Sequence, residues 1–146
     1  MNSEFVIAVH ALAYMGHKQD KVSSEELAEN ICTNPAKIRK VMSALRKQDI
    51  IATKEGKHGG YLLNKRPEDI YLDQLTNALK RDIIQAPWTS GSLDMPCMVA
   101  SGMKFVMDDM VEEMNEQIHS YLHSKSIQDV IHQLEVIAHQ NVQKEE

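Results

Sequence analysis

The sequence predicts a mostly helical protein with a small β-hairpin wing: a winged helix-turn-helix module followed by a long dimerisation helix. Residues 23–49 contain two short amphipathic helices separated by a tight turn. A basic, glycine-rich hairpin follows at 50–63, and an apolar repeat runs through 103–122. The expected segments are the DNA-binding module over 1–66, a connecting helix over 67–84, a loop over 85–96, and the long helix with a C-terminal helix over 97–146.

A first helix is predicted over residues 3–16. Its apolar positions recur at helical spacing, which favours packing beneath the next two helices. Gly16 is expected to end this helix, and a polar loop follows over 17–22. The apolar positions are Phe5, Val6, Val9, Leu12 and Ala13.

The next two helices carry clear start signals. The serine pair at 23–24 can cap the second helix, and Glu26 stands in the capping-box position. Asn34 is a suitable N-cap for the third helix, and Pro35 fits its first position because an N–H there would have no helical partner. The third helix is expected to continue to about Asp49.

The third helix has one apolar and one basic face. The apolar stripe consists of Ile38, Val41, Met42 and Leu45. Two helices joined by a tight turn, the second basic on its outer face, are typical of a helix-turn-helix. The outer face consists of Lys37, Arg39, Lys40, Ser43, Arg46 and Lys47.

Charge is distributed unevenly along the chain, although the net charge is −5. Residues 1–66 hold 11 lysines and arginines against 7 acids, whereas residues 67–146 hold 5 against 14. Within 33–66 the count is 9 against 2. A basic module joined to an acidic one suits a DNA reader attached to a domain that DNA does not touch. The alternative is that the basic helix is only a solvated face.

The hairpin has predicted strands at 50–53 and 61–63, and its turn contains glycines that permit positive φ angles. Its sequence KEGKHGGYLL, followed by RPEDIYLDQLTNAL, resembles the Rrf2 family of bacterial winged-helix transcriptional regulators over roughly residues 1–125. The resemblance implies DNA binding by a homodimer. Glu55 stands where family members commonly carry arginine, so Lys57 would have to substitute in the minor groove.

The DNA-binding residues are predicted from their place on the third helix and wing. Early positions of a recognition helix lie closest to the base edges, where lysine and arginine reach guanine acceptors. We expect base contacts from Ala36, Arg39, Lys40 and Ser43, and phosphate contacts from Lys37, Arg46 and Lys47. The wing would contribute Lys54, Lys57 and His58. Ser24, Asn34 and Gly59 complete the predicted set.

Residues 67–96 divide into a helix and a loop. Pro67 suits the first helical position, and the apolar face that follows is Ile70, Leu72, Leu75, Ala78 and Leu79. The proline and glycine content of 85–96 predicts an irregular loop, a kind of segment that is often functional. Trp88 is expected to pack this loop onto the core, and a lid or ligand-stacking role is the alternative.

A long helix is predicted from Cys97, with apolar residues spaced by three and four over about five turns. A helix of about 28 residues would be roughly 40 Å long, more than one small domain can cover. We therefore expect a homodimer, as the family resemblance also implies. A capping box at Ser126 and Asp129 starts a last helix, which is expected to pack on the dimer and to fray at its end. The predicted interface residues are Met103, Met107, Met110, Met114, Ile118 and Tyr121.

Cys97 and Trp88 are the candidate sensor residues. Some family members bind an iron–sulfur cluster through three cysteines in this loop, but here only Cys97 is present, so no cofactor is expected. Its place at a helix N-terminus favours the thiolate and hence a response to oxidants or electrophiles. The alternative is a small buried hydrophobe, and Cys32 in the helix-turn-helix is expected to be a packing residue.

Other chemistry has little support. His119 and His123 have a spacing that can hold a metal, but they point away from the apolar stripe, so a solvated face is favoured and no metal site is expected. The sequence lacks a Ser-His-Asp arrangement, a phosphate loop and an HExxH motif, so we expect no enzyme. It also lacks a basic leader and a run of 18 apolar residues, which favours the cytoplasm and no membrane span.

These observations together predict a sequence-specific, homodimeric transcriptional repressor that binds double-stranded DNA with one recognition helix per half-site. A thiol or small-molecule signal would regulate it. The alternatives are a winged-helix protein–protein adaptor that does not bind DNA, and a metal- or thiol-dependent enzyme. The basic block over 33–66 argues against the adaptor.

Overall fold

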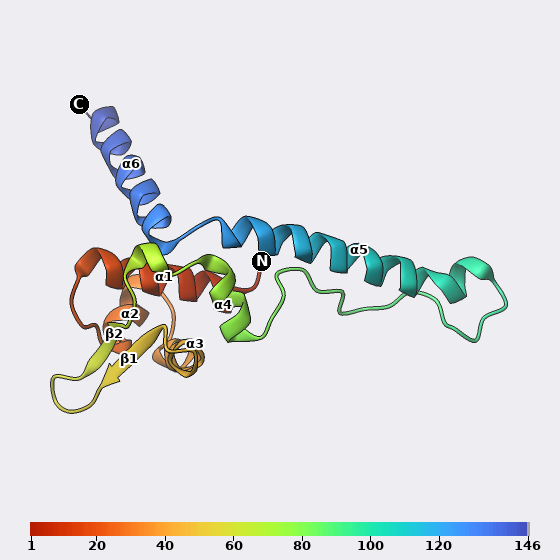
Figure 1. Cartoon of the computed structure of the whole chain (residues 1–146), viewed down its shortest axis with the longest axis horizontal. Coiled ribbons are helices and arrows are strands. Elements are labelled where there is room, and N and C mark those ends of the chain that lie inside the picture. Colours follow the sequence, from red (N-terminus) through yellow and green to blue (C-terminus); the bar gives the residue numbers. More distant parts are fainter. Residues whose placement is uncertain (146) are drawn as a thin grey trace.

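The computed structural model describes residues 1–145, and it confirms the mostly helical fold with an antiparallel β-hairpin (Figure 1). The helices of the first half and the hairpin form one body, from which two long helices extend in different directions. Glu146, the last residue of the predicted C-terminal segment, lies outside the described part. The elements are α1 (Ser3–Lys18), α2 (Ser24–Ile31), α3 (Pro35–Lys47), β1 (Ile51–Lys54), β2 (Gly60–Leu63), the 3₁₀ helix η1 (Pro67–Asp69), α4 (Leu72–Leu79), α5 (Met98–His123) and α6 (Ile127–Glu145).

The helix-turn-helix begins and ends where its local sequence predicts. The Ser23 hydroxyl accepts a hydrogen bond from the Glu26 N–H at 3.1 Å, which caps α2. The Asn34 side chain accepts one from the Lys37 N–H at 2.9 Å, and Pro35 occupies the first position of α3. Cys32 ends α2 in the left-handed conformation, with φ 60°. The two caps fix the start of both helices, and so the direction in which α3 leaves the turn.

Removing the Asn34 cap should destabilise the protein. An Asn34→Ala variant loses the acceptor for the Lys37 N–H, and we expect the free energy of unfolding to fall by about 1 kcal/mol in chemical denaturation. Asn34→Ser, which keeps an oxygen at this position, should stay within a few tenths of a kcal/mol of the native protein. Equal loss in both variants would show that the cap does not stabilise α3.

The core lies where α1, α3 and α4 meet. The predicted stripe of α3 is fully buried there: Ile38, Val41, Met42 and Leu45 are each at most 1% exposed. Phe5, Leu12 and Ala13 of α1 are also buried, as predicted. Val6 and Val9 are not, because they face a groove beside α6. Burial of the α3 stripe anchors this helix by one side and leaves its other side exposed.

The end of α1 differs from the prediction. Gly16 does not terminate the helix, which continues to Lys18 and ends at Gln19 with φ 56°. Gly16 is buried, and a Cβ atom at this position would lie 2.8 Å from Ile131 Cδ1 and 3.0 Å from Pro67 Cγ. The glycine therefore allows α6 and η1 to approach α1 closely. Its role is in tertiary packing, which the local sequence does not reveal.

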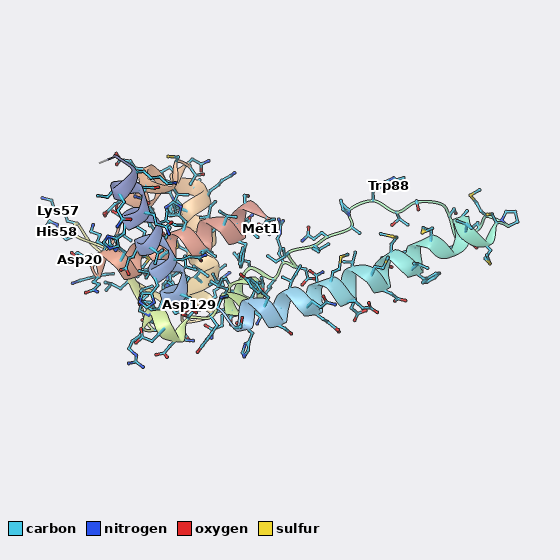
Figure 2. The ribbon with its side chains drawn as sticks, turned by 90° about the horizontal axis from the view of Figure 1, so that it is seen from above. Met1, Asp20, Lys57, His58, Trp88 and Asp129 are labelled. Carbon is cyan, nitrogen blue, oxygen red and sulfur yellow. The ribbon has the colours of Figure 1, made fainter. Side chains whose placement is uncertain are left out.

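The wing is an antiparallel hairpin in which Ile51 pairs with Leu63 and Lys54 with Gly60. It is also joined to the loop before α2, because Val22 and Tyr61 exchange backbone hydrogen bonds of 3.1 and 2.7 Å. Val22 O lies so close to Gly60 that a Cβ atom there would be 2.6 Å from it. The base of the wing is thus fixed to the start of α2, and its tip over 55–59 extends beyond the body (Figures 1 and 2).

The predicted connecting helix over 67–84 is wrong as a single element. It is divided into η1 and α4, and residues 80–84 lie outside both. Between the two pieces the chain pairs with the corner between α5 and α6: the Leu72 N–H donates to Lys125 O at 2.9 Å, and the Ile127 N–H donates to Ile70 O at 2.8 Å. This pairing interrupts the helix and joins the α5–α6 corner to the body.

Both long helices begin at the predicted residues. Cys97 is the N-cap of α5. Ser126 starts α6 through the expected capping box, in which its hydroxyl accepts from the Asp129 N–H at 3.1 Å and its N–H donates to the Asp129 carboxylate at 2.8 Å. The loop over 80–97 runs beside α5 without regular structure (Figure 1). Within residues 1–145, none of the helices is both long and apolar enough to cross a membrane.

Candidate nucleic-acid interface

The outer face of α3 presents a row of polar and basic side chains. Because the opposite stripe is buried, every predicted contact residue on this helix is held toward solvent. Asn34 at the cap is exposed as well. The exposed set on α3 is Ala36, Lys37, Arg39, Lys40, Ser43, Arg46 and Lys47. A helix anchored on one side and cationic on the other can enter the major groove of DNA.

Two of these cations face carboxylates on neighbouring helices. The Lys40 ammonium lies 2.6 Å from a carboxylate oxygen of Glu4 on α1, and the Arg39 guanidinium lies 4.0 Å from Glu25 on α2. The hydrogen bond from Lys40 is the main cause that holds the pKa of Glu4 below its ordinary value, and partial desolvation opposes it. The sequence pattern places Lys40 on the outer face of α3, but it does not indicate that Glu4, 36 residues away in the chain, is its partner.

The wing and the start of α2 together form a second part of the basic surface. Lys57 and His58 lie at the tip of the hairpin, at the edge of the body (Figure 2), and Lys54 is exposed at the end of β1. Ser24 and Gly59 are half-buried. Both line a shallow groove between the wing and the start of α2, together with Glu25, Lys54 and Glu55. The structure thus brings Lys54 and Gly59 of the wing close to Ser24, whereas Lys57 and His58 do not line this groove.

The predicted dimer stripe is largely uncovered along α5. Met107, Met110, Met114 and Tyr121 are exposed, with Met110 at 51%, while Met103 and Ile118 are half-buried. Only Leu122, at the end of the helix that reaches α4, is buried. Phe105, which lies outside the predicted stripe, is exposed too. Most of α5 extends from the body with its apolar side chains in solvent (Figure 1).

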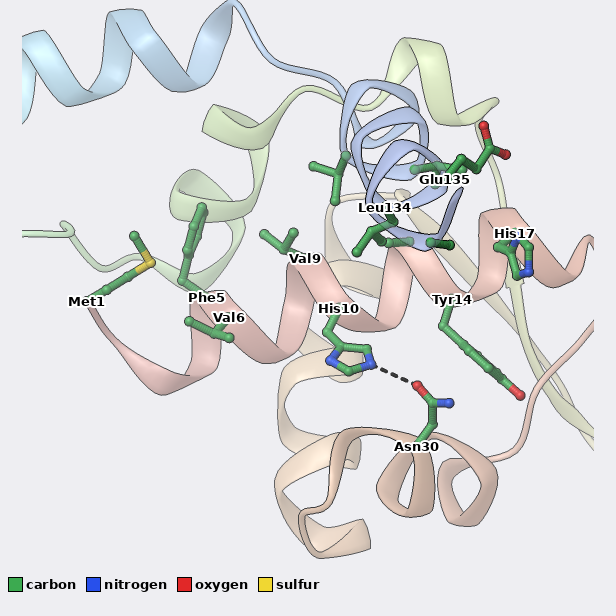
Figure 3. Close-up of a pocket in the computed structure, with 14 residues that line it drawn as sticks. Met1, Phe5, Val6, Val9, His10, Tyr14, His17, Asn30, Leu134 and Glu135 are labelled. Atoms are coloured by element: carbon green, nitrogen blue, oxygen red, sulfur yellow. Dashed lines mark hydrogen bonds between the residues drawn. The ribbon is translucent and has the colours of Figure 1, made fainter. Parts of the chain in front are cut away.

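An apolar groove lies between α1 and α6 (Figure 3). It has a volume of about 570 Å³, and its walls include Phe5, Val6 and Val9 from α1 and Leu134 from α6. His10 lies at its edge, 2.7 Å from the amide oxygen of Asn30 on α2. Only the start of α6 is packed against the body, because Ile131 is buried and Leu134 is 52% exposed.

The two candidate sensor residues are both exposed. Trp88 is 78% exposed, so the expectation that it packs the loop onto the core is wrong. It points away from α5 (Figure 2). Cys97 is exposed at the start of α5, and the nearby backbone N–H groups of Ala100 and Val99 lower the pKa of its thiol. Cys32 is exposed as well, so its predicted role as a packing residue is wrong.

Comparisons with known proteins identify the family of this chain. Residues 1–133 match the model of the Rrf2 family, described as an iron-dependent transcriptional regulator. The chain belongs to the Rrf2 family. It is 30% identical over 135 residues to a protein named as the HTH-type transcriptional regulator YwnA of Bacillus subtilis (strain 168), an alignment that spans 92% of this chain and 98% of YwnA.

Solved structures of similar shape support the Rrf2 assignment. A transcriptional regulator from Lactobacillus plantarum superposes with a TM-score of 0.76 and 27% identity, over the full length of both chains. CymR, the global cysteine regulator of B. subtilis, has a TM-score of 0.64 at 14% identity, over 90% of this chain and 95% of CymR. At that identity CymR shows the fold alone. This Rrf2 chain is therefore a transcriptional regulator with a winged-helix DNA-binding fold.

The end of α5 makes a contact with α4 in this Rrf2 chain that the sequence did not predict. His123 Nδ1 lies 2.8 Å from the Asp73 carboxylate of α4, and its ring stacks on Tyr71 at 5.9 Å. His119 lies 3.8 Å from the same oxygen. Both histidines are exposed, as predicted for a solvated face, but the sequence pattern does not indicate that they face Asp73. Asp73 is buried, and this contact joins α5 to a helix that packs against α3.

The family description mentions iron, and the donor set of this chain does not fit an iron–sulfur cluster. Such a cluster takes four ligands, mostly thiolates, whereas the loop before α5 offers only Cys97. The other cysteine, Cys32, ends α2. Over residues 1–145, no group of three histidine, cysteine or acidic side chains is arranged to hold a metal ion.

Proposed function

We propose that this Rrf2 regulator is a homodimeric repressor that reads a specific operator with α3. The observation that carries the proposal is the anchoring of α3 by its buried stripe, which holds a basic face outward beside a basic wing. Ala36, Arg39, Lys40 and Ser43 would contact bases. Lys37, Arg46, Lys47 and the wing residues Lys54, Lys57 and His58 would contact the DNA backbone. Ser24, Asn34 and Gly59 would lie along the same surface.

The uncovered apolar surfaces support a homodimer. One face of α5 carries exposed methionines over most of its length, and the groove between α1 and α6 is also open. A second copy that covers these surfaces would remove them from water, which is the main driving force for association. Two readers related by two-fold symmetry would then bind a partly palindromic operator, with half-sites about one helical turn or more apart.

Selection of fragments from a genomic DNA pool, followed by fluorescence anisotropy on the selected fragment, tests the proposal. We expect tight binding to one sequence and an affinity that falls steeply with salt, because the basic surface displaces counterions. Binding that is equally weak for all sequences would contradict the proposal. If the protein binds a partner protein, and still binds it after Arg39 and Lys40 are replaced by alanine, the result would support the adaptor instead. Repression is tested by a reporter gene fused to the selected fragment.

We further propose that Cys97 senses oxidants or electrophiles, without a cluster or catalytic activity. The lowered thiol pKa and the exposure of Cys97 support this role. Trp88, exposed in the same loop, is the second candidate for signal reception.

We place the protein in the cytoplasm, where an operator would be accessible. Metal analysis of protein purified without chelator tests the absence of an iron–sulfur cluster.

The thiol proposal predicts a pH-dependent reactivity. A lowered pKa means that Cys97 forms thiolate at a lower pH. The rate of its alkylation by iodoacetamide should therefore reach half its maximum at a lower pH than the rate for N-acetylcysteine, measured under the same conditions. Mild oxidation should lower operator affinity, and Cys97→Ser should abolish that response. An unchanged response to oxidation in Cys97→Ser would show that another residue senses the oxidant. Cys32→Ser is the matched control.

A further inference from the structure

The cations on α3 differ in their surroundings. Lys40 pairs with a carboxylate from another helix: its ammonium lies 2.6 Å from Glu4 Oε1, the Lys40 side chain is 69% exposed, and the Glu4 side chain is only 19% exposed. The guanidinium of Arg39 meets Glu25 only at 4.0 Å, with both side chains well exposed. Among the described residues, Lys37, Arg46 and Lys47 have no acidic partner within 4.0 Å. Lys40 is thus the cation of α3 that has a fixed counter-charge.

Glu4 is well placed to remain ionised and still. It lies in the first turn of α1, where the helix dipole favours a negative charge, and its own N–H donates to the Asn2 cap at 2.7 Å. The charges of Lys40, Arg81 and Lys37 also stabilise the carboxylate. Because α1 packs on α3 within the core, the distance between the two backbones is set by the fold.

We propose that Glu4 is a positioning residue that determines the specificity of DNA reading through Lys40. The carboxylate cancels the charge of the Lys40 ammonium and fixes its position, so Lys40 acts as an oriented hydrogen-bond donor and not as a mobile cation. An ammonium has three donors, and the two that Glu4 leaves free can reach acceptors such as guanine O6 and N7. A neutral pair gains little from phosphates, which are present in every sequence.

This inference rests on the proposed DNA-binding function, and it predicts how specificity changes when Glu4 is neutralised. In Glu4→Gln, Lys40 becomes a free cation that can pair with a phosphate. One additional phosphate contact steepens the slope of log affinity against log salt by about 0.9, which at 0.15 M salt corresponds to roughly fivefold tighter binding of non-operator DNA. We expect operator affinity to rise less, so the ratio of operator to non-operator affinity falls at least about twofold.

A matched control separates this effect from a general change in charge. Glu29→Gln removes one negative charge from the neighbouring helix α2, and Glu29 forms no ion pair with a described residue. Its salt slope and affinity ratio should stay close to those of the native protein. Thermal unfolding of both variants shows whether the fold is retained. Equal effects of Glu4→Gln and Glu29→Gln would overturn the proposal, because they would reflect net charge alone.

A double-mutant cycle with Lys40→Met tests whether Glu4 acts through Lys40. In the native background, Lys40→Met should weaken operator binding and leave non-operator binding within about twofold. In the Glu4→Gln background, the same change should abolish the gain in non-operator binding. Additive effects of the two substitutions would overturn the proposal.

The outcomes separate this inference from the proposed function. If the native protein prefers no DNA sequence, the proposed function itself fails. If it prefers an operator but the ratio of operator to non-operator affinity is unaltered in Glu4→Gln, only this inference fails.

Discussion

Replacement of Arg39 by alanine should weaken operator binding by about tenfold to a hundredfold. Arg39 lies on the exposed face of α3, one turn into the helix, and its nearest acidic group is 4.0 Å away, so the guanidinium is free to bond with a base. A bidentate arginine–guanine contact contributes roughly 1–3 kcal/mol of discrimination. Fluorescence anisotropy with the selected operator and with base-substituted operators measures both the affinity and the position at which specificity relaxes.

Arg66→Ala provides the matched control for Arg39→Ala. Arg66 is an exposed arginine outside α3, 3.0 Å from Asp69 in η1, so its removal changes the net charge by the same amount. We expect it to weaken operator and non-operator DNA equally, and by less than Arg39→Ala. Equal losses in the two variants, without a change in base preference, would mean that α3 is not the reading helix.

A Met110→Glu substitution should convert the proposed dimer into monomers and greatly weaken DNA binding. Met110 lies in the middle of the uncovered stripe of α5, so a second copy that covers this stripe would bury it. Burying two glutamates in an apolar seam without partners costs several kcal/mol. A monomer also loses the benefit of two linked half-sites, commonly a factor of about 10² to 10⁴. Sedimentation and anisotropy measure the two effects.

Ser120→Glu introduces the same charge on the same helix, at an exposed position away from the stripe. This variant should remain dimeric and bind DNA like the native protein. A Met110→Glu variant that stays dimeric would show that the subunits associate through another surface. The apolar groove between α1 and α6 would then be the next surface to alter.

The local sequence predicts those structural features that depend on neighbouring residues. The caps at Ser23, Asn34 and Ser126 bond to N–H groups within three residues, so their sequence signals determine the helix starts. The buried stripe of α3 follows directly from its helical period. The positions of the predicted DNA contacts on the outer face follow from the same period, and their contact with DNA stays a prediction.

The local sequence does not predict those features that depend on contacts between residues far apart in the chain. Gly16 is a sequence signal for a helix end, but contact with Ile131 and Pro67 explains the glycine. The helix expected over 67–84 is broken by hydrogen bonds to the α5–α6 corner. The Glu4–Lys40 and Asp73–His123 contacts join residues 36 and 50 positions apart. No local pattern reports such pairs, because they depend on how the helices pack.

The backbone pairing of residues 70–72 with 125–127 has a consequence for how this fold can diverge. The pairing closes a loop that contains α4, the irregular segment over 80–97 and α5. Both ends of the extended arm, residues 80–123, are therefore tied to the winged-helix module over 1–66, here called the reader. The entropy of closing a loop depends only weakly on its length. Insertions or deletions in the arm should therefore leave the reader folded. In the proposed dimer, a change in the length of this arm would alter the spacing of the two half-sites while keeping the same recognition helix.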